Sequence, residues 1–176
     1  MATKVNVEFE GFEEFKQLAD QIINDFGEKD ASNIMVAAAR QSMRSALDAA
    51  RSRVPVDTGA LRASLQIEAR KPRNKDRKSK YVQKGDVAIA LITTAPGKKL
   101  AKMKFKNERT GIKQVGIKSD ARASIMELGS ATTSAQPYLR SALESSSGTV
   151  VNDLGKTLGI ALEKYKARQA KKGKIA

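Results

Sequence analysis

Apolar residues at the start of the chain change from a two-residue period to a three- and four-residue period. Val5, Val7 and Phe9 alternate with polar residues, which predicts a short strand with one buried face. From residue 12 to 26 the apolar positions recur every three or four residues, a pattern that predicts an amphipathic helix. Gly27 is of a type that often ends helices, so we expect the helix to end there.

A second amphipathic pattern predicts a helix that begins near Asp30 or Ser32 and ends at Val54. Its apolar stripe is rich in Ala and Met, so another element can approach it closely. Pro55 ends this helix, because the residue before a proline is pushed out of helical geometry. Four basic side chains occupy its other faces, and we interpret them as solvated: Arg40, Arg44, Arg51 and Arg53.

The next residues, 55–59, combine Pro, Asp, Thr and Gly, and this composition predicts a tight turn. Asp57 or Thr58 can cap a short helical turn that continues through Leu61 and Ser64. We interpret these two polar residues as partners of backbone donors rather than of a ligand.

Two β-rich segments follow, over residues 65–69 and 86–94. In the second, Val87, Ile89 and Leu91 are expected on one face. Residues 71–85 between them are basic and contain almost nothing to bury. They therefore predict an exposed or disordered hairpin loop.

A second basic excursion covers residues 95–120. A turn-like segment at 107–111 separates Met103 and Phe105 from Ile112, Val115 and Ile117, which predicts a two-stranded arm. Such an arm is marginal alone and would be steadied by a partner.

The last third returns to an ordinary pattern. Residues 122–128 resume the domain, and a loop of small residues covers 129–134. Pro137 suits a first helical position. The apolar periodicity from Tyr138 to Tyr165 predicts one long bent helix or two helices in series.

Composition excludes most catalytic schemes. The 176 residues fit one domain and contain neither Cys nor His, which removes disulfides, thiolate metal sites and Ser–His or Cys–His nucleophiles. The carboxylates near turns are too scattered for a two-metal nuclease: Asp57, Asp86, Asp120 and Glu127. Apolar runs are too short for a membrane span, and no signal-peptide pattern occurs, so we expect synthesis in the cytoplasm.

The net charge of +14 is concentrated in one segment. Residues 1–69 carry net −3, residues 70–118 carry net +13, and residues 119–176 carry net +4. The flanking thirds therefore resemble an ordinary domain, and the middle is an excursion from it. A basic tail follows at 164–176.

Two motifs in order resemble a phage family. The first is VPVDTGALRASL over residues 54–65; the second is ELGS over 127–130 with QPYLRSAL over 136–143. Together with the preceding GFEEF helix start, they are similar to tailed-bacteriophage neck or tail-completion proteins. These are tail components of lambdoid siphophages, related to lambda minor tail protein Z. Ser130 stands where the family usually has Thr, and Ser141 where it has Pro.

The resemblance implies a single α+β domain over residues 1–176: a small antiparallel sheet packed by the long second helix and a C-terminal helix, with the basic β-arm and loop inserted. It implies a virion protein of the head–tail junction that completes the tail and joins it to the DNA-filled head. It further implies a ring, expected to hold six copies, with tail terminator, tail tube and head-closure proteins as partners. No enzymatic activity and no cofactor or metal are implied.

The family motifs supply one set of candidate site residues, for which a structural turn and a subunit contact are the alternatives. Glu127 could pair with Arg62 or Arg140 inside the fold. The set is Pro55, Asp57, Thr58, Gly59, Leu61, Arg62, Glu127, Gly129, Pro137, Tyr138 and Arg140.

The basic excursions supply the other set. They could be a solvated surface, a docking surface for acidic neighbours, or a contact with DNA phosphates in a ring lumen. We favour docking, because so much positive charge in every copy would grip DNA rather than let it slide. The alternative function is a free-standing nucleic-acid-binding protein without sequence specificity. The candidates are Lys71, Arg73, Lys75, Arg77, Lys78, Lys80, Lys98, Lys99, Lys102, Lys104 and Lys106.

Overall fold

A computed structural model describes residues 12–80, 82–117 and 122–171. The strand expected over residues 5–9 lies outside the described residues, as do Tyr81, Asp120 and the end of the basic tail. The elements in chain order are α1 (Phe12–Ser42), α2 (Arg44–Arg53), α3 (Ala60–Ser64), β1 (Leu65–Arg70), η1 (Asp76–Lys78), β2 (Ile89–Thr94), α4 (Gly97–Leu100), β3 (Lys104–Lys106), β4 (Lys113–Val115), α5 (Arg122–Leu128) and α6 (Tyr138–Lys171).

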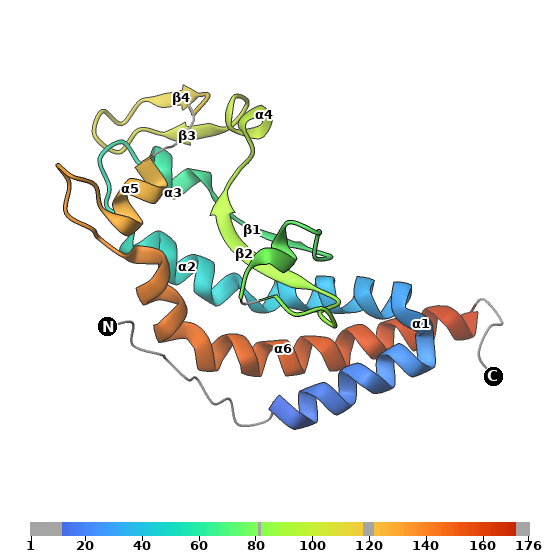
Figure 1. Cartoon of the computed structure of the whole chain (residues 1–176). Coiled ribbons are helices and arrows are strands. Elements are labelled where there is room, and N and C mark those ends of the chain that lie inside the picture. The colour runs from blue at the N-terminus through green and yellow to red at the C-terminus, as the bar shows by residue number, and fades with distance from the viewer. Residues whose placement is uncertain (1–11, 81, 118–121, 172–176) are drawn as a thin grey trace.

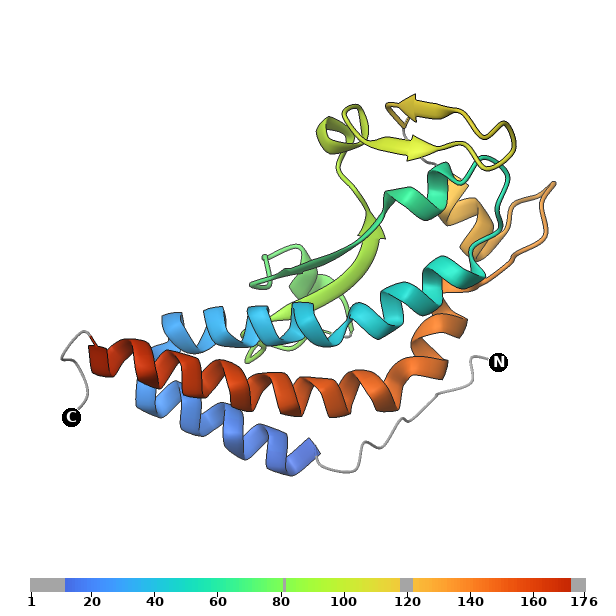
Figure 2. The same cartoon turned by 180° about the vertical axis from the view of Figure 1, so that it is seen from behind.

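The α+β class is confirmed, with α1, α2 and α6 on one side and two small antiparallel sheets on the other, accompanied by the short helices α3, α4 and α5 (Figure 1). The sheet of β1 and β2 lies against the second half of α1 and against α2. The long helix α6 packs on the opposite side of this helix layer (Figures 1 and 2). The smaller sheet, β3 and β4, stands at one end of the molecule.

The break predicted at Gly27 is confirmed, because this residue has φ 75° and ψ 157° within α1. The two halves of α1 lie on opposite sides of α6 (Figure 2). The second predicted helix is not continuous: it is interrupted at Met43, so that α1 ends at Ser42 and α2 begins at Arg44. It stops where expected, since Val54 is extended, with φ −62° and ψ 131°.

One long bent helix, α6, is the alternative that the structure adopts for the C-terminal third (Figure 1). Serine hydroxyls near the bend donate to carbonyls of the preceding turn: Ser145 and Ser146 to Ala142, and Ser147 to Glu144. Such back-bonding competes with the helical ladder and bends helices. Farther along, Leu158 is fully buried against Ala31, Ile34, Met35 and Ala38 of α1.

The register of the main sheet shows which face of β2 points to the core. Ile67 is opposite Ile92 and Ala69 is opposite Ala90, so Ala90 and Ile92 share the core-facing side with Leu65 of β1. Leu91 is opposite Glu68 and is 43% exposed. Ile89 and Leu91 therefore share one face of β2, as predicted, and it is the face turned away from the helices. Val87, just before β2, does pack against the core around Leu158.

The outer edge of β1 is occupied by two arginines from the helices. Ser64 O accepts from the Ala95 N–H, and alternation along the ladder then directs the carbonyls of Leu65 and Ala69 away from β2. Arg51 donates to the Leu65 carbonyl at 2.9 Å, and Arg40 donates to the Ala69 carbonyl at 2.8 Å. Arg40 is exposed and the Arg51 side chain is 42% exposed, so both remain in contact with solvent as predicted, but each also bonds the strand edge.

We expect Arg40→Met to lower the free energy of unfolding by about 1 kcal/mol, because it keeps much of the hydrocarbon stem but removes the donor to the Ala69 carbonyl. Arg44→Met is the matched control, since Arg44 is exposed on the adjoining helix, and it should change stability by less than about 0.5 kcal/mol. Urea unfolding measures both. Equal effects would show that the Arg40 contact with the strand edge contributes nothing.

Candidate functional site

The first family motif forms the turn between α2 and α3, as predicted. Gly59 occupies the N-cap position of α3 in a left-handed conformation, with φ 77° and ψ −1°. The Thr58 hydroxyl accepts a long hydrogen bond, 3.4 Å, from the Ala60 N–H. Thr58 therefore satisfies a backbone donor as expected, but neither it nor Asp57 is the N-cap residue.

The tip of the β3–β4 arm lies on this turn. The backbone N–H of Glu108 donates to the Thr58 carbonyl at 3.1 Å. The Glu108 carboxylate accepts a hydrogen bond from Arg62 and forms an ion pair with it. A second ion pair, at 3.6 Å, joins Arg109 of the arm to Asp57 of the turn. The arm is therefore fixed to the domain by the family motif itself.

Two features of the contact explain its residue types. Gly59 is required by its left-handed backbone, and a Cβ there would lie 2.6 Å from the Glu108 carboxylate. Asn107, only 4% exposed, shapes the arm tip by accepting hydrogen bonds from the N–H groups of Arg109 and Thr110. Sequence reasoning identified the 107–111 turn but missed Glu108 as its anchor. The available signal was that Glu108 is the lone acid between residues 87 and 118.

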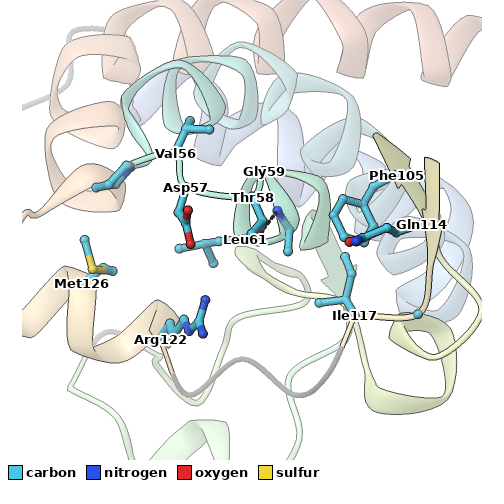
Figure 3. A pocket seen from close by; sticks show the side chains of 13 residues that line it. Val56, Asp57, Thr58, Gly59, Leu61, Phe105, Gln114, Ile117, Arg122 and Met126 are labelled. Carbon is cyan, nitrogen blue, oxygen red and sulfur yellow. Dashed lines mark hydrogen bonds between the residues drawn. The ribbon is translucent and has the colours of Figure 1, made fainter. Parts of the chain in front are cut away.

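A pocket of about 550 Å³ opens between the turn, the arm and α5. Its walls are mainly apolar, with Leu61, Phe105 and Met126 among the lining side chains. Asp57 and Arg122 enter the space from opposite walls (Figure 3). Phe105, Arg122 and Met126 had not been identified as site residues.

On the other side of the same contact lies a more open hollow of about 640 Å³. Four basic side chains line it: Arg51, Arg62, Lys104 and Lys106. Glu108 is its acidic lining residue. Gly59 and Phe105 line both spaces. Basic residues from the family motif and from the arm are thus brought together, which suits an anionic partner.

The second family motif builds the start of α6. Both Glu127 carboxylate oxygens accept backbone hydrogen bonds, from Leu139 at 2.8 Å and from Arg140 at 3.0 Å. A carboxylate here satisfies helix donors that have no partner within the helix. The expected pairing of Glu127 with the Arg62 or Arg140 side chain was therefore wrong: Arg62 bonds Glu108, and Arg140 contributes its N–H.

The remaining motif residues have structural positions. Gly129 is left-handed, with φ 81°, and a Cβ there would lie 3.1 Å from the Ala135 backbone N. Tyr138 is 2% exposed and packs in the core with Leu65 and Val54. Pro137 immediately precedes α6, and Pro55 lines the pocket.

The basic loop over 71–85 is organised by an ion cluster. Arg70 binds the Asp76 carboxylate with two nitrogens, at 2.5 and 3.0 Å, and also donates to Glu68. Asp76 accepts the Arg73 N–H as well, at 2.7 Å. These bonds lower the pKa of Asp76 well below its usual range and raise the pKa of Arg70. The loop is exposed as predicted, but it has defined internal contacts.

The structure separates the loop cations into two groups. Arg77 is used within the loop, donating to the carbonyls of Gln83 and Lys84 at 2.9 and 2.6 Å. Arg77 is nevertheless exposed, as are the other loop cations: Lys71, Arg73, Lys75, Lys78 and Lys80. Because it is already bonded within the loop, Arg77 is a poor candidate for partner contact, whereas Lys71, Arg73, Lys75 and Lys78 form an exposed basic surface.

The arm carries the second basic surface. Lys99 donates to the Gln66 side chain at 2.7 Å, which ties α4 to β1. On the arm, Lys106 is directly opposite Lys113, and Lys104 is opposite Val115, which is 68% exposed. Like charges directly opposite each other destabilise a ladder, so this face favours an anionic neighbour. Lys98 and Lys102 are also exposed.

Among the described residues, no group of three or more acidic side chains could hold a metal ion. Within the same ranges, no helix combines the length and apolar composition needed to cross a bilayer.

Comparison with known protein families assigns the chain to one protein class, components of phage tails. A family model described as "Bacteriophage HK97-gp10, putative tail-component" matches residues 16–131, more than half of the chain. The chain belongs to this family, and with it to the proteins of the phage virion. No curated protein and no solved structure matches the chain.

We expect Gly59→Ala to destabilise the protein by about 1–3 kcal/mol, because it adds left-handed backbone strain and a Cβ against Glu108. In a Glu108→Ala background the steric part disappears, and the cost should fall to about 1 kcal/mol. Urea unfolding of the four proteins gives the double-mutant cycle. Gly155→Ala in α6, where a Cβ meets nothing within 4 Å, is the control and should not destabilise. If Gly59→Ala destabilises the protein equally in the parent and in the Glu108→Ala background, the close contact between Gly59 and Glu108 is contradicted.

The lowered pKa of Asp76 predicts how the loop responds to acid. A carboxyl whose pKa is depressed by folding stabilises above its unfolded pKa, 3.8, and loses that contribution only as pH falls through its lower folded value. The Arg73 amide should therefore stay protected from hydrogen exchange at pH 4 and lose protection in stronger acid.

Asp76→Ala should remove the protection of the Arg73 amide from hydrogen exchange at pH 7. Asp86→Ala is the matched control, since Asp86 accepts the Gln83 N–H at the far end of the loop. It should leave the Arg73 amide protected. Loss of wild-type protection near pH 4 would contradict the assigned cluster.

Proposed function

We propose that this tail component forms a ring at the head–tail junction, with six copies, which completes the tail and joins it to the DNA-filled head. Its role is structural rather than enzymatic. Tail terminator, tail tube and head-closure proteins are the proposed neighbours, and a relationship to lambda minor tail protein Z belongs to the same proposal.

The observation that carries this proposal is the fixed arm. The family turn holds the arm tip through Glu108 and Arg109, so the arm projects from the domain in one orientation. A preorganised charged surface loses less conformational entropy on binding than a flexible one. The exposed lysines of the arm then serve to steer and align acidic neighbours.

The loop over 71–85 supports the same interpretation. Its anchoring acid, Asp76, is paired with Arg70, and the exposed cations around it remain directed at solvent. Contact with genomic DNA in a ring lumen is the second candidate function. It is favoured by the opposed Lys106 and Lys113, which a phosphate could neutralise together.

Charge reversal in the phage separates the two functions. A deletion of the gene is complemented with Lys71→Glu, Lys75→Glu and Lys78→Glu combined in one chain. If the loop docks on acidic neighbours, electron microscopy should show filled heads and unjoined tails, with DNA retained in the heads. The matched control reverses three exposed helix cations, Lys29, Arg44 and Arg53, and should support joining.

Normal joining with loss of packaged DNA would instead favour DNA contact. Density for this chain in intact virions anywhere other than the neck or upper tail would contradict the proposed location.

A further inference from the structure

The main sheet has one open edge. In the described chain β2 pairs only with β1, so its other side has no strand beside it. The ladder pattern directs the N–H and C=O groups of Ala90, Ile92 and Thr94 toward this side. The corresponding edge of β1 is covered by Arg40 and Arg51. Arginine side chains therefore cover the β1 edge, whereas the β2 edge has backbone groups that another strand can pair with.

The core-facing side of the sheet is also uncovered at β2. On β1, Leu65 and Ala69 are 1% and 3% exposed. Their partners on β2, Thr94 and Ala90, are only half-buried, as is Ile92. An additional strand beside β2 would complete the burial of this apolar side, which the helices leave half-buried.

The sequence contains a segment of matching chemistry. Residues 4–10 alternate between Val5, Val7 and Phe9 on one side and Asn6, Glu8 and Glu10 on the other. The apolar set suits the side of Ala90 and Ile92. The acidic set suits surroundings that are basic at both ends of β2, where Lys84 precedes the strand and Lys98 and Lys99 follow it.

The position of α1 favours a neighbouring copy as the source of this segment. The first turns of α1 lie on the far side of α6 from the sheet in both views (Figures 1 and 2). To reach the β2 edge of its own chain, the segment would have to pass around two layers of helix.

We propose that residues 4–10 of one copy add as a third strand to the free β2 edge of the next copy. Main-chain hydrogen bonds to Ala90, Ile92 and Thr94 provide the affinity, and the alternating side chains set the register. The contact is heterologous, since donor and acceptor surfaces differ, and repetition of it can close a ring. It rests on the proposed ring and names one contact between its subunits.

Cysteine cross-linking tests the proposal directly, because the chain has no cysteine of its own. Full-length Val7→Cys and Ala90→Cys chains are purified separately, mixed and treated with a short bifunctional thiol reagent. The mixture should give a cross-linked dimer on a denaturing gel at several times the yield of either chain alone. Val7→Cys mixed with Ile160→Cys is the control, since Ile160 is exposed on α6 away from the sheet.

Absence of the heterodimer overturns the proposal. So does a double Val7→Cys, Ala90→Cys chain that links only within itself, which would assign the edge to its own segment. Native mass spectrometry separates failure of this contact from failure of the proposed function. A ring that forms without the cross-link contradicts this contact but is consistent with the proposed function. A chain that stays monomeric and binds no tail protein contradicts both.

Ala90→Pro provides a second variant. It removes an N–H that faces the free edge and leaves the ladder with β1 intact. The variant should keep the helical circular dichroism of the parent and lose association at least tenfold. Unchanged association in a folded Ala90→Pro chain would contradict the proposal, and the cross-linking result decides if this variant does not fold.

Discussion

The contact between the arm tip and the Pro55–Arg62 turn positions the basic arm and shapes the two hollows beside it. Glu108 donates its N–H to Thr58, pairs with Arg62 and leaves no room for a side chain at Gly59. A two-stranded arm of this length is marginal alone. This contact fixes its tip, and an apolar cluster that joins Phe105 and Ile117 to Ala60 and Ala63 of α3 fixes its base. The tip contact also creates the two hollows, because both are bounded by Gly59 and Phe105.

Basic residues divide into those that build the fold and those that cover its surface. Arg40 and Arg51 protect a strand edge, Arg62 and Arg70 hold acidic partners, and Arg77 closes a loop. The lysines of the arm and loop are largely exposed. The guanidinium group suits the structural role, since it offers several donors in a fixed plane and stays charged. The net charge is therefore mainly a property of the lysine-rich surface.

Much of the fold follows from the sequence. Periodicity predicted the break at Gly27, the end of the helix before Pro55, both strands of the main sheet and the pairing of the arm. These features depend on neighbours within a few residues, which a linear pattern records. The family motifs also identified the turn and the α6 start. The same reasoning missed Glu108 and the role of Glu127, because their partners are distant in sequence or are backbone groups that no composition reveals.

The sequence by itself determined the main helices, strands and turns, where the charge is concentrated, and that catalysis by Cys or His is excluded. Only the tertiary structure decided which face of β2 is buried, which arginines are structural and which turn carries the arm. The physical reason is that burial of Ile92 rather than Leu91 depends on the register with β1. Likewise, an arginine becomes a strand-edge donor only when a carbonyl is placed within hydrogen-bonding distance of it.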